Sequence, residues 1–231
     1  MRYIVSFFVY ICSIKPYRTM NDTPKHCIIT IGRSFGAGGR ELGQKLARLL
    51  GYDYYDKELL IDAARNVGLD TTIFEKNDER APGFLSGVLP MSMGYSALAW
   101  YTGPNSAGGE SVYRAQSDFM RRVASQGPCV IVGRTADYAL RDFPGTVNIF
   151  LHAPEDVCIR RIMDRGDCDK PEKARSILRK TNRLRAEFYN FYTDRTWGDS
   201  ATYDITFDTS KLPVDAIASL VIAYIEARGL K

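Results

Sequence analysis

Residues 27–51 read CIITIGRSFGAGGRELGQKLARLLG and predict a buried strand, a glycine-rich turn and an amphipathic helix in direct succession. The first five residues are apolar and rich in β-branched side chains, which is typical of a buried strand. From residue 42 onwards, leucines recur at the helical period, and Gly51 stands where a helix would end. Four glycines lie between strand and helix, and glycine lets backbone N–H groups approach a ligand closely. The stretch therefore predicts a phosphate-binding loop at a helix N-terminus.

The loop departs from the Walker A pattern G-x-x-x-x-G-K-[ST] at the first glycine, at the lysine and at the final Ser/Thr, where Arg40 stands. In the best register, against residues 33–40, the first glycine is Arg33 and the lysine is Gly39. We expect Arg40 to supply the missing cation from one position further on, with Ser34 or Glu41 nearest to a hydrated Mg²⁺. A tight turn that needs glycine only for packing is the alternative interpretation.

The composition is that of an ordinary globular protein. The 231 residues are 45% hydrophobic and 25% charged, which favours a single α/β domain with an insertion. A net charge of +4 is spread along the chain, so we expect small acidic ligands and no DNA, although an RNA-binding patch stays open. Five scattered cysteines without a C-x-x-C pair indicate reduced thiols and a cytoplasmic location. Two histidines are too few for a histidine-based metal site.

We expect residues 1–27 to be an N-terminal extension outside the fold. The apolar run 3–14 is too short to span a bilayer, which needs about 20 residues. No A-x-A-like cleavage site follows it, so a signal peptide is not predicted either. Met20, just ahead of a polar lead-in to the first strand, would make a natural start of the protein.

Residues 28–231 are expected to form one domain, because strand and helix patterns alternate along them. Further strands are predicted at 52–55, 129–133, 147–151 and 203–207, and the first of these is followed by a helical pattern at 57–67. This alternation predicts a three-layer α/β fold, with a parallel sheet flanked by helices. Ligands bind beyond the carboxyl ends of the strands in such sheets.

Two regions interrupt the regular alternation. Residues 70–127 are predicted to form an inserted acceptor-binding or flap region, because large apolar side chains recur among glycine, proline and serine in its first part. Residues 155–195 are strongly basic and are predicted to form a lid.

The order of these pieces resembles the cytidylate kinase-like family of nucleoside monophosphate kinases, in the P-loop NTPase superfamily. The motifs that carry the resemblance are IGRSFGAGGREL, GYDYYDKELL, CVIVGRTADYAL, NIFLHAPEDVCIRRI and YDITFDTSKL. The resemblance implies a P-loop kinase fold with a helical insertion and a lid. It also implies phosphoryl transfer from ATP to a nucleoside monophosphate, with CMP or dCMP as the first expected acceptor. The resemblance further implies that Mg²⁺ is held mainly by phosphates and water.

The resemblance assigns expected roles by position. The expected ATP-binding residues are Ser34, Phe35, Gly36, Ala37, Gly38, Gly39, Arg40 and Glu41. The expected acceptor-binding residues are Asp56, Lys57, Arg134 and Asp137. The cations expected to neutralise the transferring phosphoryl group are Arg40, Arg161, Arg165, Lys180, Arg183 and Arg185. No protein ligand to a metal is expected.

Several alternatives stay open at this point. The family carries acids where this chain has Thr181, Asn182 and Leu184, so cytosine recognition by those acids is not implied. The missing lysine keeps open a non-catalytic nucleotide-binding regulatory module, and the insertion keeps open a kinase for another small-molecule acceptor. The basic helices could be a solvated face, Arg134 a strand-end salt bridge and Asp56 a helix N-cap. An oligomer is possible.

Overall fold

A five-stranded parallel sheet forms the centre of the molecule. The computed structural model describes residues 26–56, 109–133 and 135–230. The strands are β1 (Ile28–Arg33), β2 (Asp53–Tyr55), β3 (Cys129–Val132), β4 (Thr146–His152) and β5 (Ile205–Asp208). Their order across the sheet is β2-β3-β1-β4-β5, and every neighbouring pair runs parallel. The strand that precedes the glycine loop is therefore central.

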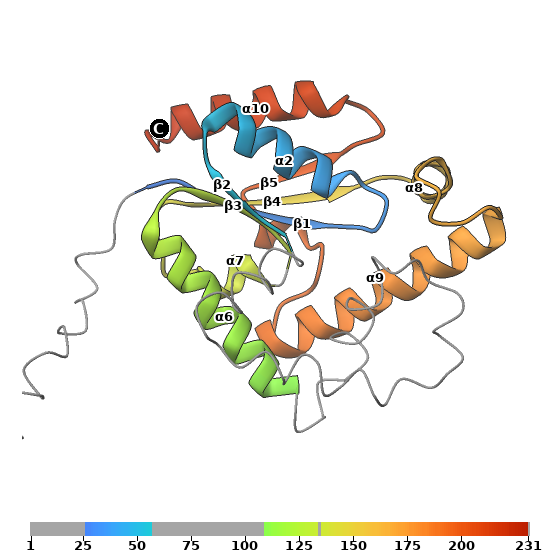
Figure 1. Cartoon of the computed structure of the whole chain (residues 1–231), viewed down its shortest axis with the longest axis horizontal. Helices are drawn as coiled ribbons and strands as arrows, with labels where there is room; N and C mark the ends of the chain where they lie inside the picture. Colours follow the sequence, from blue (N-terminus) through green and yellow to red (C-terminus); the bar gives the residue numbers. More distant parts are fainter. Residues whose placement is uncertain (1–25, 57–108, 134, 231) are drawn as a thin grey trace, which may run out of the picture.

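Helices cover both faces of this sheet, as Figure 1 shows. On one face, α2 (Gly39–Leu50) packs against α10 (Val214–Ala227). On the other face lie α6 (Gly109–Gln126) and the short α7 (Ala136–Ala139). Beyond β4, α8 (Glu155–Asp164) packs on the long α9 (Pro171–Thr193), and a 3-10 turn, η3 (Ser200–Thr202), leads into β5. This is the predicted three-layer α/β architecture.

The two faces of β1 serve two separate cores, because successive side chains of a strand point to opposite sides. Ile29 and Ile31 are buried against Leu42 and Leu46 of α2. Ile28 is buried in the other core, with Met120 of α6 and residues of α7. Continuous apolar strands are what a parallel sheet covered on both faces requires.

The structure differs from the expected N-terminal boundary by two residues. Cys27 is 1% exposed and belongs to the core, and the imidazole of His26 contacts the carbonyl oxygen of Ala124. The described fold therefore begins at residue 26, ahead of the expected start at 28. The expected helix 57–67 and the first part of the insertion 70–127 lie outside the described residues; α6 is the described part of that insertion. Within the described ranges, no helix has the length and hydropathy to cross a membrane.

Candidate functional site

The glycine loop, residues 34–38, connects the end of β1 to the start of α2 at the carboxyl edge of the sheet. Gly36 and Gly38 have φ values of 80° and 82°, which side chains with a Cβ atom rarely adopt. The backbone N–H of Ser34 donates to the carbonyl oxygen of Leu151 at 2.9 Å and ties the loop to β4. The loop thus reverses the chain tightly, above the ends of two adjacent strands.

The N-terminus of α2 faces this loop without a side-chain cap. Gly38 is the N-cap residue and has no side chain to accept from the first-turn N–H groups. Such N–H groups and the positive end of the helix dipole favour an anion at this position. Glu41, the acidic residue of the first turn, is exposed.

Helices α8 and α9 contact the loop from the side. A Cβ atom on Gly36 would lie 2.9 Å from the carbonyl oxygen of Cys158 in α8, so only glycine fits there. The N–H of Phe35 donates to Oδ1 of Asn182 at 2.8 Å. Nη1 of Arg185 donates to the carbonyl oxygen of Arg33 at 3.0 Å. The loop conformation is therefore coupled to α9.

Two arginines flank the ring of Phe35. The guanidinium carbon of Arg165 lies 5.3 Å from the ring centroid and that of Arg185 lies 5.5 Å from it, both within the range of cation–π attraction. The ring itself packs against the apolar cluster between α8 and α9. Phe35 thus holds two cations at the edge of the loop.

Arg33 runs from the end of β1 between two glycines. A Cβ atom on Gly39 would lie 2.7 Å from Cγ of Arg33, and one on Gly133 would lie 2.7 Å from its Cζ. Burial lowers the pKa of Arg33 to about 10; Tyr54 opposes this shift, Arg40 adds to it and Asp56 opposes it. The guanidinium therefore stays protonated at neutral pH, at the edge between the glycine loop and the end of β3.

Asp56 follows β2 and pairs with Arg40. Nε of Arg40 lies 3.3 Å from Oδ2 of Asp56, whose side chain is 11% exposed. The hydroxyl of Tyr54 donates to the same oxygen at 3.4 Å. Burial raises the pKa of Tyr54, so this hydroxyl remains protonated and remains a donor. The carboxylate is thus fixed beside the first turn of α2.

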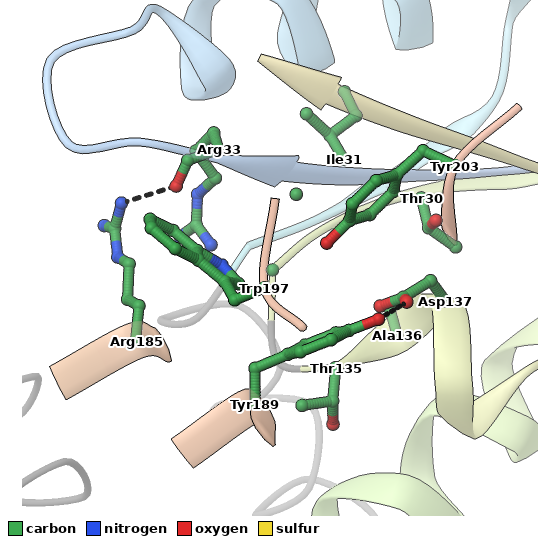
Figure 2. A pocket seen from close by; sticks show the side chains of 12 residues that line it. Thr30, Ile31, Arg33, Thr135, Ala136, Asp137, Arg185, Tyr189, Trp197 and Tyr203 are labelled. Carbon is green, nitrogen blue, oxygen red and sulfur yellow. Dashed lines mark hydrogen bonds between the residues drawn. The ribbon is translucent and has the colours of Figure 1, made fainter. Parts of the chain in front are cut away.

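A polar pocket opens below the ends of β1 and β3, and Figure 2 shows the side chains that line it. Arg33 and Arg185 lie at one end, and Asp137, Tyr189 and Tyr203 lie at the other. The hydroxyl of Tyr189 donates to Oδ2 of Asp137 at 2.6 Å. Burial raises the pKa of Asp137; the hydrogen bond from Tyr189 and the charge of Arg195 oppose that rise. The pocket therefore has a cationic end and a hydroxyl–carboxyl end.

A model of the cytidylate kinase-like family matches residues 28–211. The chain belongs to this family. A crystal structure of an uncharacterized protein from Eubacterium ventriosum is similar over 87% of this chain and 99% of that chain, with a TM-score of 0.65 and 28% identity. A shikimate kinase from Bacteroides thetaiotaomicron covers 87% of this chain and 98% of its own at a TM-score of 0.50 and 14% identity, and shows the P-loop kinase fold alone. No curated protein matches the sequence significantly.

The structure gathers several of the expected site residues of this cytidylate kinase-like chain. The expected ATP-binding residues 34–41 form the glycine loop and the first turn of α2. Arg185 and Asp137 line the pocket, and Arg165 lies beside Phe35, where its Nη2 also bonds Oδ2 of Asp167 at 2.7 Å. Lys57 and Arg134 lie outside the described residues.

Three of the cations expected to neutralise the phosphoryl group lie outside the lining of the pocket. Arg161 donates from Nη1 and Nη2 to the side-chain and carbonyl oxygens of Thr209, each at 2.8 Å, and so anchors the end of β5. Nε of Arg183 lies 3.7 Å from Oε1 of Glu187 one turn along α9, and its side chain is 71% exposed. Lys180 is exposed on the same helix. These three do not line the described pocket.

The pocket also contains residues that the sequence did not single out as site residues: Arg33, Tyr189, Trp197 and Tyr203. Asn182, which accepts from the N–H of Phe35 and does not line the pocket, is a further residue that the sequence did not assign to the site. For Arg33 a signal was present, because it continues the alternation of Ile29 and Ile31 on the α2 face of β1. No comparable signal marks Tyr189, whose partner Asp137 is 52 residues away.

The described residues offer no ready metal centre. No group of three or more histidine, cysteine, aspartate or glutamate side chains within these ranges could hold an ion. The four described cysteines, Cys27, Cys129, Cys158 and Cys168, are buried and free.

Proposed function

We propose that the protein transfers the terminal phosphoryl group of ATP to a nucleoside monophosphate, with CMP or dCMP as the expected acceptor. Membership of the cytidylate kinase-like family and the P-loop kinase fold support phosphoryl transfer as the class of reaction. The observation that carries the proposal is the glycine loop. Two left-handed glycines and the uncapped start of α2 lie at the carboxyl edge of the sheet, next to a pocket with a cationic end.

The donor would bind at the loop. Backbone N–H groups of residues 36–40 would hold the β-phosphate, and Mg²⁺ bound through phosphates and water would neutralise further charge. The guanidinium groups of Arg165 and Arg185 lie beside the ring of Phe35, which is a residue of the loop. Positioned cations of this kind contribute most of the protein's part in phosphoryl transfer, since little covalent chemistry is required.

The acceptor would bind across the pocket and the end of β2. Asp56 would accept hydrogen bonds from its sugar or base, as would Asp137, and Lys57 and Arg134 would contact its phosphate. An arginine binds phosphate with a planar, bidentate fork. Arg161, Lys180 and Arg183 would contribute only if the lid repositions them. We further propose that the protein acts in the cytoplasm, in keeping with its free, buried thiols.

The experiment is a coupled ADP-release assay on the full chain. ATP and Mg²⁺ are supplied with CMP, dCMP, UMP, AMP or GMP in parallel, and the reaction without acceptor gives the background hydrolysis. Turnover with CMP or dCMP is the expected result. Turnover with only another monophosphate would reassign the acceptor.

A second candidate is a nucleotide-binding module without turnover. It is favoured by Gly39, which stands where the P-loop lysine of active kinases is found. ATP binding measured by calorimetry, together with no ADP release for any of the five acceptors, would favour this module over the kinase.

A further inference from the structure

The search for the missing P-loop cation leads to Arg33. The stem of Arg33 occupies the space from which a lysine at position 39 would start, because a Cβ atom there would lie 2.7 Å from Cγ, 3.1 Å from Cβ and 3.2 Å from Cδ of Arg33. Cβ is fixed by the backbone of Arg33, and Cγ and Cδ could move only by a rotation about χ1 that carries the guanidinium away from its observed place. A lysine at position 39 therefore excludes the observed position of the Arg33 side chain.

The guanidinium extends to the point where donor and acceptor sites would meet. It lies against Gly133, whose N–H donates to the carbonyl oxygen of Ile31 at 2.9 Å beside the end of β1. It also lines the polar pocket, together with Arg185 (Figure 2). Within the described ranges no carboxylate forms an ion pair with Arg33, whereas Arg40 is paired with Asp56. Arg33 is thus the better placed of the two for a phosphate.

Glycine at positions 39 and 133 leaves the space that the side chain of Arg33 occupies. Any larger residue at 39 or 133 would displace the stem or the guanidinium of Arg33. The departures from the Walker A pattern at positions 33 and 39 are then a single exchange. The cation has moved from the first residue of α2 to the last residue of β1, and the glycine has moved the other way.

We infer that Arg33, and not Arg40, takes the place of the P-loop lysine and binds the β- and γ-phosphates of the donor nucleotide. This inference rests on the proposed function, since it names the cation of that same site. It does not depend on the identity of the acceptor.

The test measures ATP and ADP affinity of the full chain by calorimetry with Mg²⁺ and without acceptor. Arg33→Ala is expected to weaken ATP binding about tenfold or more, which is the effect of losing one charged hydrogen bond to phosphate. Arg40→Ala is expected to weaken it less. Arg48→Ala, in the exposed last turn of the same helix, is the matched control and should change nothing.

A second set of variants tests the exchange itself. Gly39→Lys alone should bind ATP poorly, because the new side chain collides with Arg33. The double variant Arg33→Gly/Gly39→Lys returns the glycine and the lysine to their Walker A positions, with Arg40 unchanged at the Ser/Thr position. It should recover most of the affinity lost in Arg33→Ala. Thermal unfolding of each variant checks that it is folded, and the double variant keeps the test readable if Arg33→Ala does not fold.

Each outcome decides the matter. Unchanged ATP affinity in Arg33→Ala, or a double variant that binds no better than Gly39→Lys alone, would overturn the inference. A wild-type protein that binds ATP but phosphorylates no monophosphate would refute the proposed kinase activity and leave the Arg33 measurement valid. A wild-type protein that binds neither ATP nor ADP would refute both.

Discussion

The backbone N–H of Phe35 donates to Oδ1 of Asn182 at 2.8 Å, which joins the glycine loop to the middle of α9 across 147 residues of sequence. Within the loop, the N–H of Ala37 donates to the carbonyl oxygen of Ser34 at 3.3 Å. Asn182 thus helps to set the loop conformation before any ligand arrives, and pre-ordering a binding loop lowers the entropic cost of binding.

Replacing Asn182 by alanine tests this link. The N–H of Phe35 loses its acceptor, so ATP affinity should fall by about twofold to tenfold, the range expected for one neutral hydrogen bond. Hydrogen exchange at the amides of residues 34–38 should become faster in the free protein. Ser176→Ala, an exposed change on the same helix, is the control. Equal exchange rates in Asn182→Ala and wild type would show that the contact does not order the loop.

Alanine substitutions at Gly36 and Gly51 separate the stability cost of backbone strain from that of close packing. Both have positive φ, 80° and 69°, but a Cβ atom would meet the backbone of Cys158 at position 36 and nothing within 4 Å at position 51. Gly51→Ala should therefore cost about 1 kcal/mol, the penalty of a left-handed non-glycine residue. Gly36→Ala should cost about 2–5 kcal/mol, because overpacking adds to that penalty.

The measurement is urea unfolding of both variants, together with ATP binding. Gly36→Ala should lose ATP affinity because the loop is pushed away from α8, whereas Gly51→Ala should keep it. Equal free energies of unfolding for the two variants would mean that the loop shifts without cost, and that its contact with Cys158 does not fix it.

Asp56→Asn separates donor binding from acceptor binding. The variant removes the charge that pairs with Arg40 and lies near Arg33, so ATP affinity should stay equal or rise slightly. The KM for the monophosphate should rise, because the amide replaces a charged acceptor of hydrogen bonds. Stability should fall by about 1 kcal/mol or less, since Arg40 is 59% exposed and exposed pairs contribute little.

Steady-state kinetics with each substrate varied in turn checks this prediction. Asp53→Asn, an exposed change in the same strand, should leave both KM values unchanged. A rise in the KM for ATP with an unchanged KM for the acceptor would place Asp56 on the donor side.

The central fold was predictable because short-range signals coincide with it. The apolar runs of β1, β3 and β4 and the glycines before α2 each indicate one structure, and the parallel sheet follows from their alternation. The position of Arg33 was predictable only in part: its alternation with Ile29 and Ile31 indicates the α2 face, but whether it lies on that face depends on where β1 ends. The sequence pattern ends the strand at Ile31, which would place Arg33 in the loop; the observed strand continues to Arg33 and turns it towards α2.

The hydroxyl–carboxyl end of the pocket was less predictable from the sequence. Asp137 was expected at the site from the family resemblance, but its partner Tyr189 comes from α9. That contact depends on the angle at which α9 crosses the sheet edge, and no local pattern encodes an angle. Trp197 illustrates the same limit: it packs edge-on to Phe150 at 5.3 Å, as a core residue would, and also lines the pocket.

Asp137→Asn should make the protein more stable and less active. Burial raises the pKa of Asp137 above 3.8 in the folded protein, so the unfolded chain loses this proton first as the pH rises. The free energy of unfolding of the wild type therefore falls from about pH 4 upwards until the carboxyl has also ionised in the folded protein. At lower pH the Asp137 carboxyl is protonated in both states, and its ionisation does not reduce stability. The asparagine has no proton to lose, and its carbonyl oxygen can still accept from Tyr189.

Urea unfolding at a series of pH values measures the difference between the two proteins. The advantage of Asp137→Asn should be absent near about pH 3, grow as the pH rises and then stay constant. The KM for the monophosphate should rise in the same variant, because the acceptor loses a carboxylate; sites of this kind often reduce stability for the sake of binding. Parallel stability curves for variant and wild type would show that the carboxyl ionises equally in the folded and unfolded states, and that Tyr189 and Arg195 fully offset its burial.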